Sequence, residues 1–302
     1  MIKNVIKKMV VGGTRKLNSG FEIPMIGMGC SRNIEQLDAS VEVALKSGYR
    51  LFDTARIYNN EQVLGDSLKK HLKELNIKRE DIFITTKVPT INESPAESVD
   101  QHIADSLKRL QTDYIDLVLV HYPRDRYTGK DEEKETNIRG RKIVYQKLEE
   151  YVDRGIIRSI GVSNYEVYHL NELLRFARVK PSVNQIEYTP YCTKPQIVEV
   201  CNDNGIFVQA FSSLCWGDQQ ILNEPIITEL VKKYNVSPQT ILYAFAVNAG
   251  VGIIPKSATP SRINDNLNLV DSVKFTDTEL NQVLDLDRNH QFRAGSRSWR
   301  VL

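Results

Sequence analysis

The stretch Gly48-Tyr-Arg-Leu-Phe-Asp-Thr-Ala-Arg-Ile-Tyr-Asn-Asn-Glu61 is the most informative segment of this chain for its fold. A short apolar strand, Leu51–Asp53, ends in a carboxylate, and a helical segment begins at Glu61. Tyr58 lies in the turn between them. A strand that passes through a turn into a helix is one unit of a βα fold. This unit places an acid and a phenol together at one strand end, which is typical of a proton-transfer site.

The same unit recurs along the whole chain, because short apolar runs alternate with segments of helical spacing. The predicted strands are Met25–Gly29, Leu51–Asp53, Ile82–Lys87, Leu117–His121, Ile160–Val162, Val183–Glu187, Phe207–Phe211 and Gly252–Pro255. The predicted helices are Glu35–Ser47, Glu61–Leu75, Ala96–Leu110, Lys142–Arg154, Val167–Ala177, Gln196–Asn204 and Ile226–Ala249. Strict alternation predicts parallel strands with right-handed crossovers, and eight units of this length predict an α/β fold, the (β/α)₈ TIM barrel. We expect one domain over residues 1–302, with an N-terminal β-hairpin from Thr14 to Ile23 that turns at Asn18-Ser-Gly20.

A doubly wound open sheet is the alternative for this pattern. It favours Gly-x-Gly-x-x-Gly in the first turn, but Gly27-Met-Gly29 is followed by Cys30-Ser31-Arg32. No Gly-Lys-Ser phosphate loop occurs either, so the barrel is favoured. The longest irregular stretch is Tyr122–Ile138, which we expect to be a charged loop on the face where the strands end.

The composition points to a cytoplasmic protein without a nucleic-acid or membrane partner. The net charge of +2 gives no field that would favour nucleic acid or a membrane surface. Lysines interrupt the apolar residues of the first segment, so a signal peptide is not expected, and no apolar run is long enough to span a bilayer. The four cysteines form no C-x-x-C pair, which favours reduced thiols. The five histidines show no metal-binding spacing, so no metal is expected. For the oligomeric state, we expect a monomer.

Four residues form a candidate catalytic group. Asp53, Lys87 and His121 each end a predicted strand, and Tyr58 follows the strand of Asp53. In a barrel these strand ends ring one mouth. A carboxylate beside Lys87 would keep the ammonium charged, and that charge would favour the phenolate of Tyr58 and lower its pKa. Any one of these residues could be a surface or structural charge, but four strand-end positions together favour a proton-transfer site.

The second half of the chain indicates a nucleotide site. Amides and hydroxyls end the later strands, in Gly161-Val-Ser-Asn164, Val183-Asn-Gln-Ile-Glu187 and Gln209-Ala-Phe-Ser-Ser-Leu214. The last strand continues as Ile254-Pro-Lys-Ser257, and Arg262 and Asp265-Asn266 follow on a short predicted helix. Helix N-termini attract phosphate, and Lys and Arg can complete such a site. Each charge alone could equally be a solvated surface residue.

With these segments in view, the chain resembles the aldo-keto reductase superfamily from about Gly27 to Asp287. The resemblance implies a reductase that binds NADPH across the barrel mouth and reduces small carbonyl substrates. It implies that Asp53, Tyr58, Lys87 and His121 form the catalytic tetrad, with Tyr58 as the general acid. The implied cofactor contacts fall into four groups. They are Ser163, Asn164 and Gln185 at the nicotinamide carboxamide; Phe211, Ser212 and Leu214 at the end of the seventh strand, with Phe211 stacking on the nicotinamide; Lys256, Ser257 and Arg262 at the 2′-phosphate; and Asp265 and Asn266 at the adenine.

The departures from the family pattern concern the substrate. Phe211 stands where the family usually has tyrosine, and Ser31, Pro89 and Tyr122 stand at pocket-wall positions where tryptophan is common. We therefore expect an open, tolerant substrate pocket. Trp216 and Trp299 could line this pocket, but ordinary packing is expected for each. Two other functions stay open: a non-catalytic regulatory protein that binds NADPH on the same fold, and a metal-dependent barrel hydrolase. The intact tetrad argues against the first, and the lack of clustered metal ligands argues against the second.

Overall fold

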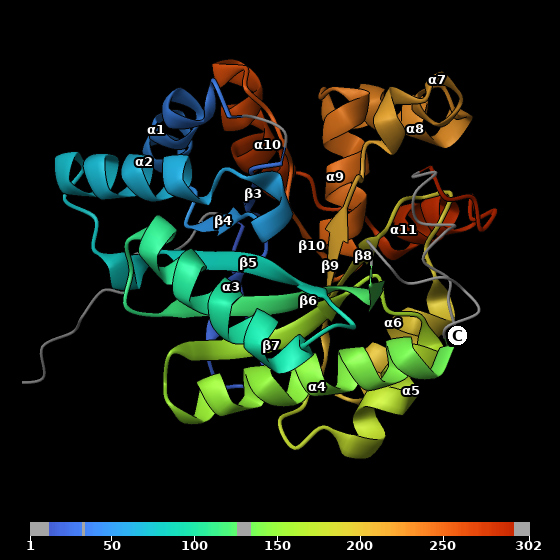
Figure 1. Ribbon diagram of the computed structural model, residues 1–302. Coiled ribbons are helices and arrows are strands. Elements are labelled where there is room, and N and C mark those ends of the chain that lie inside the picture. Colours follow the sequence, from blue (N-terminus) through green and yellow to red (C-terminus); the bar gives the residue numbers. More distant parts are fainter. Residues whose placement is uncertain (1–11, 32–33, 126–133, 293–302) are drawn as a thin grey trace, which may run out of the picture.

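Parallel strands form the centre of this computed structural model, which describes residues 12–31, 34–125 and 134–292 (Figure 1). Eight of the described strands pair in chain order, each with the next. They are β3 (Met28–Gly29), β4 (Leu51–Asp53), β5 (Phe83–Thr90), β6 (Ile115–Asp125), β7 (Ile157–Ser163), β8 (Val183–Glu187), β9 (Phe207–Phe211) and β10 (Gly252–Ile253). A parallel bridge between Ile26 and Ile253 joins the last strand to the first, and the Gly27 amide donates to the Ile253 carbonyl at 2.8 Å. The sheet is therefore a closed ring, which confirms the predicted barrel over the open sheet.

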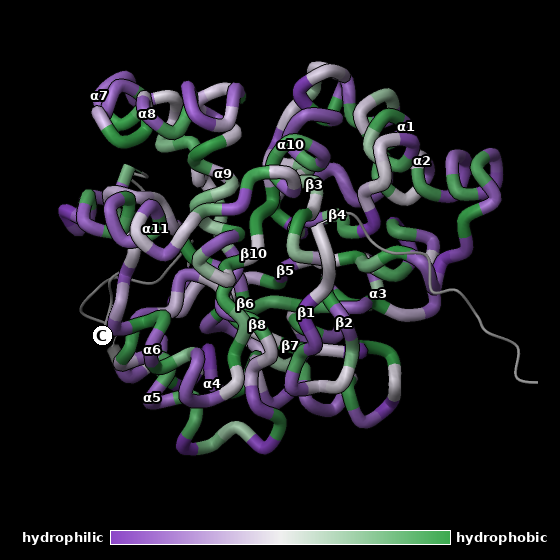
Figure 2. Tube along the Cα trace, turned by 180° about the vertical axis from the view of Figure 1, so that it is seen from behind, coloured by the Kyte–Doolittle hydropathy of each residue, from purple (hydrophilic) through white to green (hydrophobic). Residues whose placement is uncertain are grey.

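Helices surround this ring on its outer side (Figure 1). They are α1 (Leu37–Ser47), α2 (Glu61–Glu74), α3 (Pro95–Leu110), α4 (Lys134–Asp153), α5 (Val167–Phe176), α6 (Pro195–Asp203), α7 (Gln219–Leu222), α8 (Pro225–Tyr234), α9 (Pro238–Asn248), α10 (Pro260–Ser272) and α11 (Asp277–Leu284). Short 3₁₀ helices add η1 (Arg56–Tyr58), η2 (Arg79–Asp81) and η3 (Cys215–Gly217). The helical spacing works as predicted: Leu64, Leu68 and Leu72 of α2 are all buried. Figure 2 shows hydrophobic residues concentrated in the central strands, while the helices alternate hydrophobic and hydrophilic residues.

The barrel interior has an apolar floor and a polar mouth. Leu51, Phe83, Leu117 and Phe207, near the starts of their strands, pack together inside the ring. Alternate residues of a strand point to the same side, so the residues two and four positions later also point inward. Those positions include Asp53, Lys87 and His121 at the strand ends. The fold thus separates an apolar half that stabilises the barrel from a polar half that carries the candidate site.

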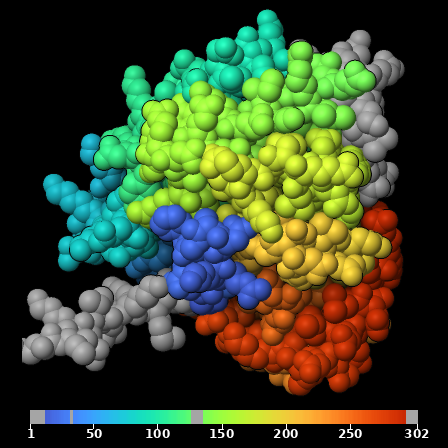
Figure 3. Space-filling view, turned by 90° about the horizontal axis from the view of Figure 1, so that it is seen from below, coloured from blue at the N-terminus to red at the C-terminus, as the bar shows by residue number. Residues whose placement is uncertain are grey.

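The N-terminal hairpin closes the floor of the barrel. Strands β1 (Thr14–Lys16) and β2 (Glu22–Pro24) pair antiparallel, as predicted. Leu17 and Ile23 pack into the apolar interior cluster, and the Asn18 side chain donates to the Pro181 carbonyl at 2.9 Å, just before β8. In Figure 3 the hairpin (blue) lies in the middle of this face, between the first and second halves of the barrel.

Two sequence predictions about elements are wrong. The irregular stretch Tyr122–Ile138 is much shorter, because β6 continues to Asp125 and α4 begins at Lys134; residues 126–133, with most of the predicted loop charges, lie outside the described residues. The long helix Ile226–Ala249 is two helices, α8 and α9. Asn235 ends α8 in the left-handed conformation (φ 52°), and the Ser237 hydroxyl caps α9 by accepting from the Thr240 amide at 3.2 Å.

Candidate active site

A cavity of about 550 Å³ opens at the polar end of the barrel. It lies where the strands end, as the sequence predicted for the working face. Eleven predicted site residues line it: Ser31, Asp53, Tyr58, His121, Ser163, Asn164, Gln185, Phe211, Ser212, Leu214 and Lys256. The fold therefore brings the predicted catalytic residues and the predicted nicotinamide contacts to one place.

Lys87 and Asp53 form a buried ion pair at the base of this cavity. The Lys87 Nζ lies 2.5 Å from Asp53 Oδ1 and also donates to the Thr54 carbonyl at 2.9 Å. Both side chains are almost completely buried. Burial by itself lowers the pKa of Lys87, but the Asp53 carboxylate and the nearby Tyr58 outweigh it, so the pKa of Lys87 is raised above its ordinary value. The ammonium is thus held charged at neutral pH.

Tyr58 and His121 stand beside this pair. The Lys87 Nζ lies 5.4 Å from the centre of the Tyr58 ring. The Tyr58 and His121 rings meet edge to face, with their centres 5.8 Å apart and their planes at 83°. Tyr122 stacks on the other side of His121, at 4.4 Å and 7°. The four predicted tetrad residues are therefore neighbours in space, although 68 positions separate Asp53 from His121 (121 − 53).

The loop that carries Tyr58 is fixed by buried hydrogen bonds. Thr54 Oγ1 donates to Asn60 Oδ1 at 2.6 Å, and Asn60 Nδ2 donates to the Cys30 carbonyl at 2.6 Å. Asn59 takes the left-handed conformation (φ 55°) that turns the chain from η1 into α2. The Thr-x-x-x-x-x-Asn spacing therefore holds the turn, and Tyr58 keeps its place at the mouth.

The predicted nicotinamide contacts form one hydrogen-bonded group. Ser163 Oγ donates to the Gln185 carbonyl at 2.8 Å, and Asn164 Nδ2 donates to the His121 carbonyl at 2.9 Å and to Ser163 Oγ at 3.0 Å. Gln185 Nε2 donates to Asp53 Oδ2 at 2.8 Å. Phe211 lies at the end of β9 and lines the same cavity. Amide and hydroxyl groups beside an aromatic ring suit a flat ring with a carboxamide, so these residues fit a nicotinamide.

The predicted phosphate contacts are different, because they are mostly exposed. Lys256 and Arg262 are exposed, and Ser257 is half-buried. Asp265 and Asn266 are half-buried on α10, which is longer than the short helix that we expected. Lys256 lines the cavity, whereas the other four are not among its lining residues. Two cations at the N-terminal end of a helix are the features that an anion requires, so this region fits a phosphate.

The predicted substrate wall is only partly at the cavity. Ser31 lines it, while Pro89 and Tyr122 are buried and are not among its lining residues. Their contact with substrate stays a prediction. Sequence reasoning missed Ile57, next to Tyr58, and Tyr243 of α9, which both line the cavity.

Trp216 also lines the cavity and is 64% exposed, so the expectation of ordinary packing is wrong for it. Trp216 takes the left-handed conformation (φ 58°) within η3. Trp299 lies outside the described residues.

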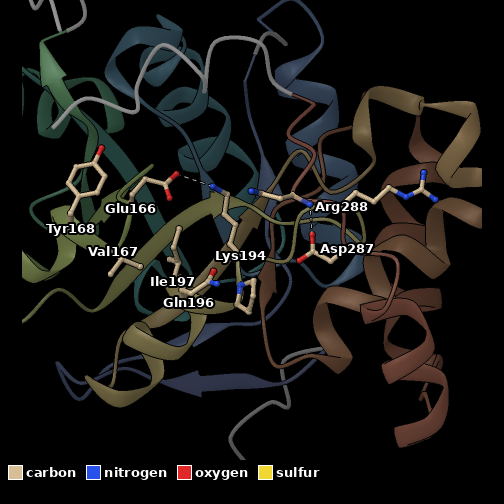
Figure 4. Close-up of a pocket in the computed structure, with 10 residues that line it drawn as sticks. Glu166, Val167, Tyr168, Lys194, Gln196, Ile197, Asp287 and Arg288 are labelled. Atoms are coloured by element: carbon tan, nitrogen blue, oxygen red, sulfur yellow. Dashed lines mark hydrogen bonds and ion pairs between the residues drawn. The ribbon is translucent and has the colours of Figure 1, made fainter.

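A second cavity, of about 670 Å³, is larger but less suited to this chemistry (Figure 4). It lies between the starts of α5 and α6 and residues 287–289. Its charged side chains are already paired: Lys194 Nζ lies 3.0 Å from Glu166 Oε1, and Arg288 contacts Glu224 at 2.6 Å. Asp287 accepts a hydrogen bond from the Thr193 hydroxyl. The smaller cavity, where the candidate catalytic group lies, is therefore the candidate active site.

Comparison with known proteins shows the family of this chain. Residues 27–288 match the model of the aldo/keto reductase family. The chain belongs to the aldo-keto reductase family. Glyoxal reductase of Bacillus subtilis is 39% identical over 85% of this chain and 87% of its own, and NAD(P)H-dependent D-xylose reductase of Kluyveromyces lactis is 34% identical over 92% and 94%. A solved aldo-keto reductase of Bombyx mori in complex with NADP superposes with a TM-score of 0.84, at 28% identity, over 94% of this chain and 95% of its own.

Family membership makes this aldo-keto reductase an oxidoreductase of carbonyl groups. Within residues 12–31, 34–125 and 134–292, no group of three or more His, Cys, Asp or Glu is placed to hold a metal ion. None of the helices in these ranges is both long enough and apolar enough to cross a membrane.

Proposed function

We propose that this aldo-keto reductase reduces aldehydes and ketones to alcohols with NADPH, and that Tyr58 is the general acid. The observation that carries the proposal is the contact chain Asp53–Lys87–Tyr58–His121 at the polar end of the barrel. NADPH, when bound, supplies the hydride that reduces the carbonyl carbon. The similar proteins named as glyoxal and xylose reductases act on small carbonyl compounds, which supports the same substrate class here.

Each tetrad residue has a distinct role in this proposal. Tyr58 gives its hydroxyl proton to the carbonyl oxygen as negative charge develops there. The Lys87 ammonium stabilises the phenolate that Tyr58 leaves, and Asp53 keeps that ammonium in place and charged. His121 hydrogen-bonds to the carbonyl oxygen and orients it toward Tyr58. The buried Lys87–Asp53 pair is fixed before substrate arrives, so little reorganisation is required during proton transfer.

The cofactor is held at two ends. Ser163, Asn164 and Gln185 would bind the carboxamide, and Phe211, Ser212 and Leu214, which line the same cavity, would contact the nicotinamide ring. Lys256, Ser257 and Arg262 bind the 2′-phosphate, and Asp265 and Asn266 bind the adenine. A 2′-phosphate contact favours NADPH over NADH, because NADH lacks the charged group that Lys256 and Arg262 would neutralise.

The test is NADPH oxidation by the full-length protein against a panel of aldehydes, aldoses, α-keto compounds, quinones and ketosteroids. We expect turnover of several classes with high KM values, since small wall residues such as Ser31 offer little apolar contact area. A single substrate bound tightly, with little activity on the rest, would contradict the open pocket. NADPH binding without turnover of any class would favour the regulatory alternative, for which the tetrad geometry gives no support.

A further inference from the structure

Gln185 is held at both N–H groups of its side chain. Its Nε2 donates to Asp53 Oδ2 at 2.8 Å and to Gln209 Oε1 at 2.8 Å. Gln185, Asp53 and Gln209 are each at most 2% exposed. Lys87 occupies the other oxygen of Asp53. A continuous row of side chains therefore runs from Lys87 through Asp53 and Gln185 to Gln209, across strands β5, β4, β8 and β9.

The row sets which end of the Gln185 amide faces the cavity. An ionised carboxylate only accepts hydrogen bonds, so Asp53 requires the Nε2 of Gln185 on its side. Gln209 Oε1 then accepts the second N–H. The Gln185 Oε1 has no hydrogen bond within the described part of the chain, and Gln185 lines the cavity, so this oxygen is the group that remains for a ligand.

Gln209 is placed to fix the orientation of the Gln185 side-chain amide. It pairs in register with Gln185 on the adjacent strand. Phe207 and Phe211, two positions before and after it, lie in the interior cluster and at the cavity, so the Gln209 side chain also faces the barrel interior. Its own Nε2 is buried and has no hydrogen-bond partner among the described residues. A buried amide with an unsatisfied donor is unfavourable, and the bond that Gln209 Oε1 accepts from Gln185 is the one side-chain hydrogen bond of Gln209 among the described residues.

We propose that Gln209 is a positioning residue that holds the Gln185 amide with its oxygen toward the nicotinamide carboxamide. The inference rests on the proposed function, because it needs Gln185 to bind the carboxamide. With Gln209 in place, Gln185 accepts a hydrogen bond from the carboxamide N–H. Without it, the Gln185 amide keeps only the bond to Asp53 and can rotate about it, so cofactor affinity falls while proton transfer at Tyr58 is preserved.

The experiment compares Gln209→Met, which keeps side-chain length and removes the acceptor, with Gln209→Glu, which keeps an oxygen acceptor. Loss of one hydrogen bond predicts a rise of about fivefold in the NADPH Kd of Gln209→Met, with kcat changed by less than about twofold, and recovery of most of the affinity in Gln209→Glu. The 3-acetylpyridine analogue of NADPH, whose methyl ketone cannot donate, should bind Gln209→Met and the parent equally.

Two further variants separate positioning from general destabilisation. Thr85→Val removes a buried hydroxyl that has no hydrogen-bond partner among the described residues, from an inward-facing position of β5, and should leave the NADPH Kd unchanged. In a Gln185→Met background, Gln209→Met should have no further effect on Kd. An unchanged Kd in Gln209→Met, or an equal loss in Thr85→Val, would overturn the inference while leaving the reductase proposal intact. Failure of the parent protein to bind or oxidise NADPH would instead overturn the proposed function.

Discussion

The two ends of the proposed cofactor site are built in opposite ways. At the nicotinamide end, Asp53, Lys87 and Gln185 are buried and bonded to one another within the protein. At the phosphate end, Lys256 and Arg262 are exposed at the start of α10. The first end must hold atoms in fixed positions for a reaction, whereas the second only has to attract a charge. Rigidity is therefore concentrated at the nicotinamide end, where the chemistry requires it. We call the nicotinamide end the rigid end and the phosphate end the open end.

Tyr58→Phe should produce the largest change, because it removes the proposed acid from the rigid end without removing the ring. We expect kcat to fall by about 10²–10⁴-fold, as for loss of a general acid. NADPH should still bind, because the phenol makes no cofactor contact in the proposal. Steady-state kinetics together with a cofactor titration measure both quantities. Turnover that stays within about tenfold of the parent would rule out Tyr58 as the acid.

Lys87→Met should show how strongly the rigid end depends on its ion pair. It leaves the Asp53 carboxylate buried without its cation, so we expect the free energy of unfolding to fall by about 3–5 kcal/mol. Denaturant titration measures this loss. The control is Lys78→Met, which removes a largely exposed ion pair with Glu80 and should have no measurable effect. Similar losses in both variants would mean that burial of the pair is not what matters.

The same pair predicts a dependence of stability on alkaline pH. The folded-state pKa of Lys87 is raised, because the Asp53 carboxylate and Tyr58 outweigh the effect of burial. Its contribution to stability is therefore complete below the ordinary lysine pKa of about 10.4 and is lost as the pH rises through the raised folded-state value. The difference in the free energy of unfolding between the parent and Lys87→Met, measured by denaturant titration, should therefore become smaller as the pH rises across that alkaline range.

Arg262→Ala tests the open end. We expect the NADPH Kd to rise by about tenfold or more, since a hydrogen bond to a charged group is worth about 1.5–3 kcal/mol, while the NADH Kd changes by less than about twofold. Lys274→Ala, just past the other end of α10, removes an exposed charge at a site remote from the proposed phosphate and is the matched control. Cofactor fluorescence titrations at fixed salt decide it. Equal weakening for both cofactors would remove Arg262 from the 2′-phosphate site.

The positions of the residues at the rigid end could be predicted from the sequence, but the hydrogen bonds between their side chains could not. Asp53, Lys87 and His121 could be placed at the mouth because strand ends meet there in any barrel. The bond from Gln185 to Asp53 joins residues 132 positions apart and depends on which strands face each other across the ring. Its consequence for Gln209 could not be predicted from local pattern. The prediction of one helix over Ile226–Ala249 is wrong, although Asn235-Val-Ser-Pro238 is a local signal for a helix end and a new helix start.

Tyr122→Ala should have the smallest effect on the kinetic constants. It tests whether the rigid end extends into the substrate pocket. Tyr122 is buried and stacks on His121 at 4.4 Å. If its ring also contacts the substrate, removing it weakens the ground state and the transition state together, so KM should rise by about five- to tenfold with a smaller fall in kcat. Tyr122→Phe keeps the ring and should behave like the parent. The opposite result, a fall in kcat that exceeds the rise in KM, would mean that Tyr122 acts by holding the His121 ring in place. In that case the substrate wall would have to be sought among Ser31, Ile57 and Trp216, which line the cavity.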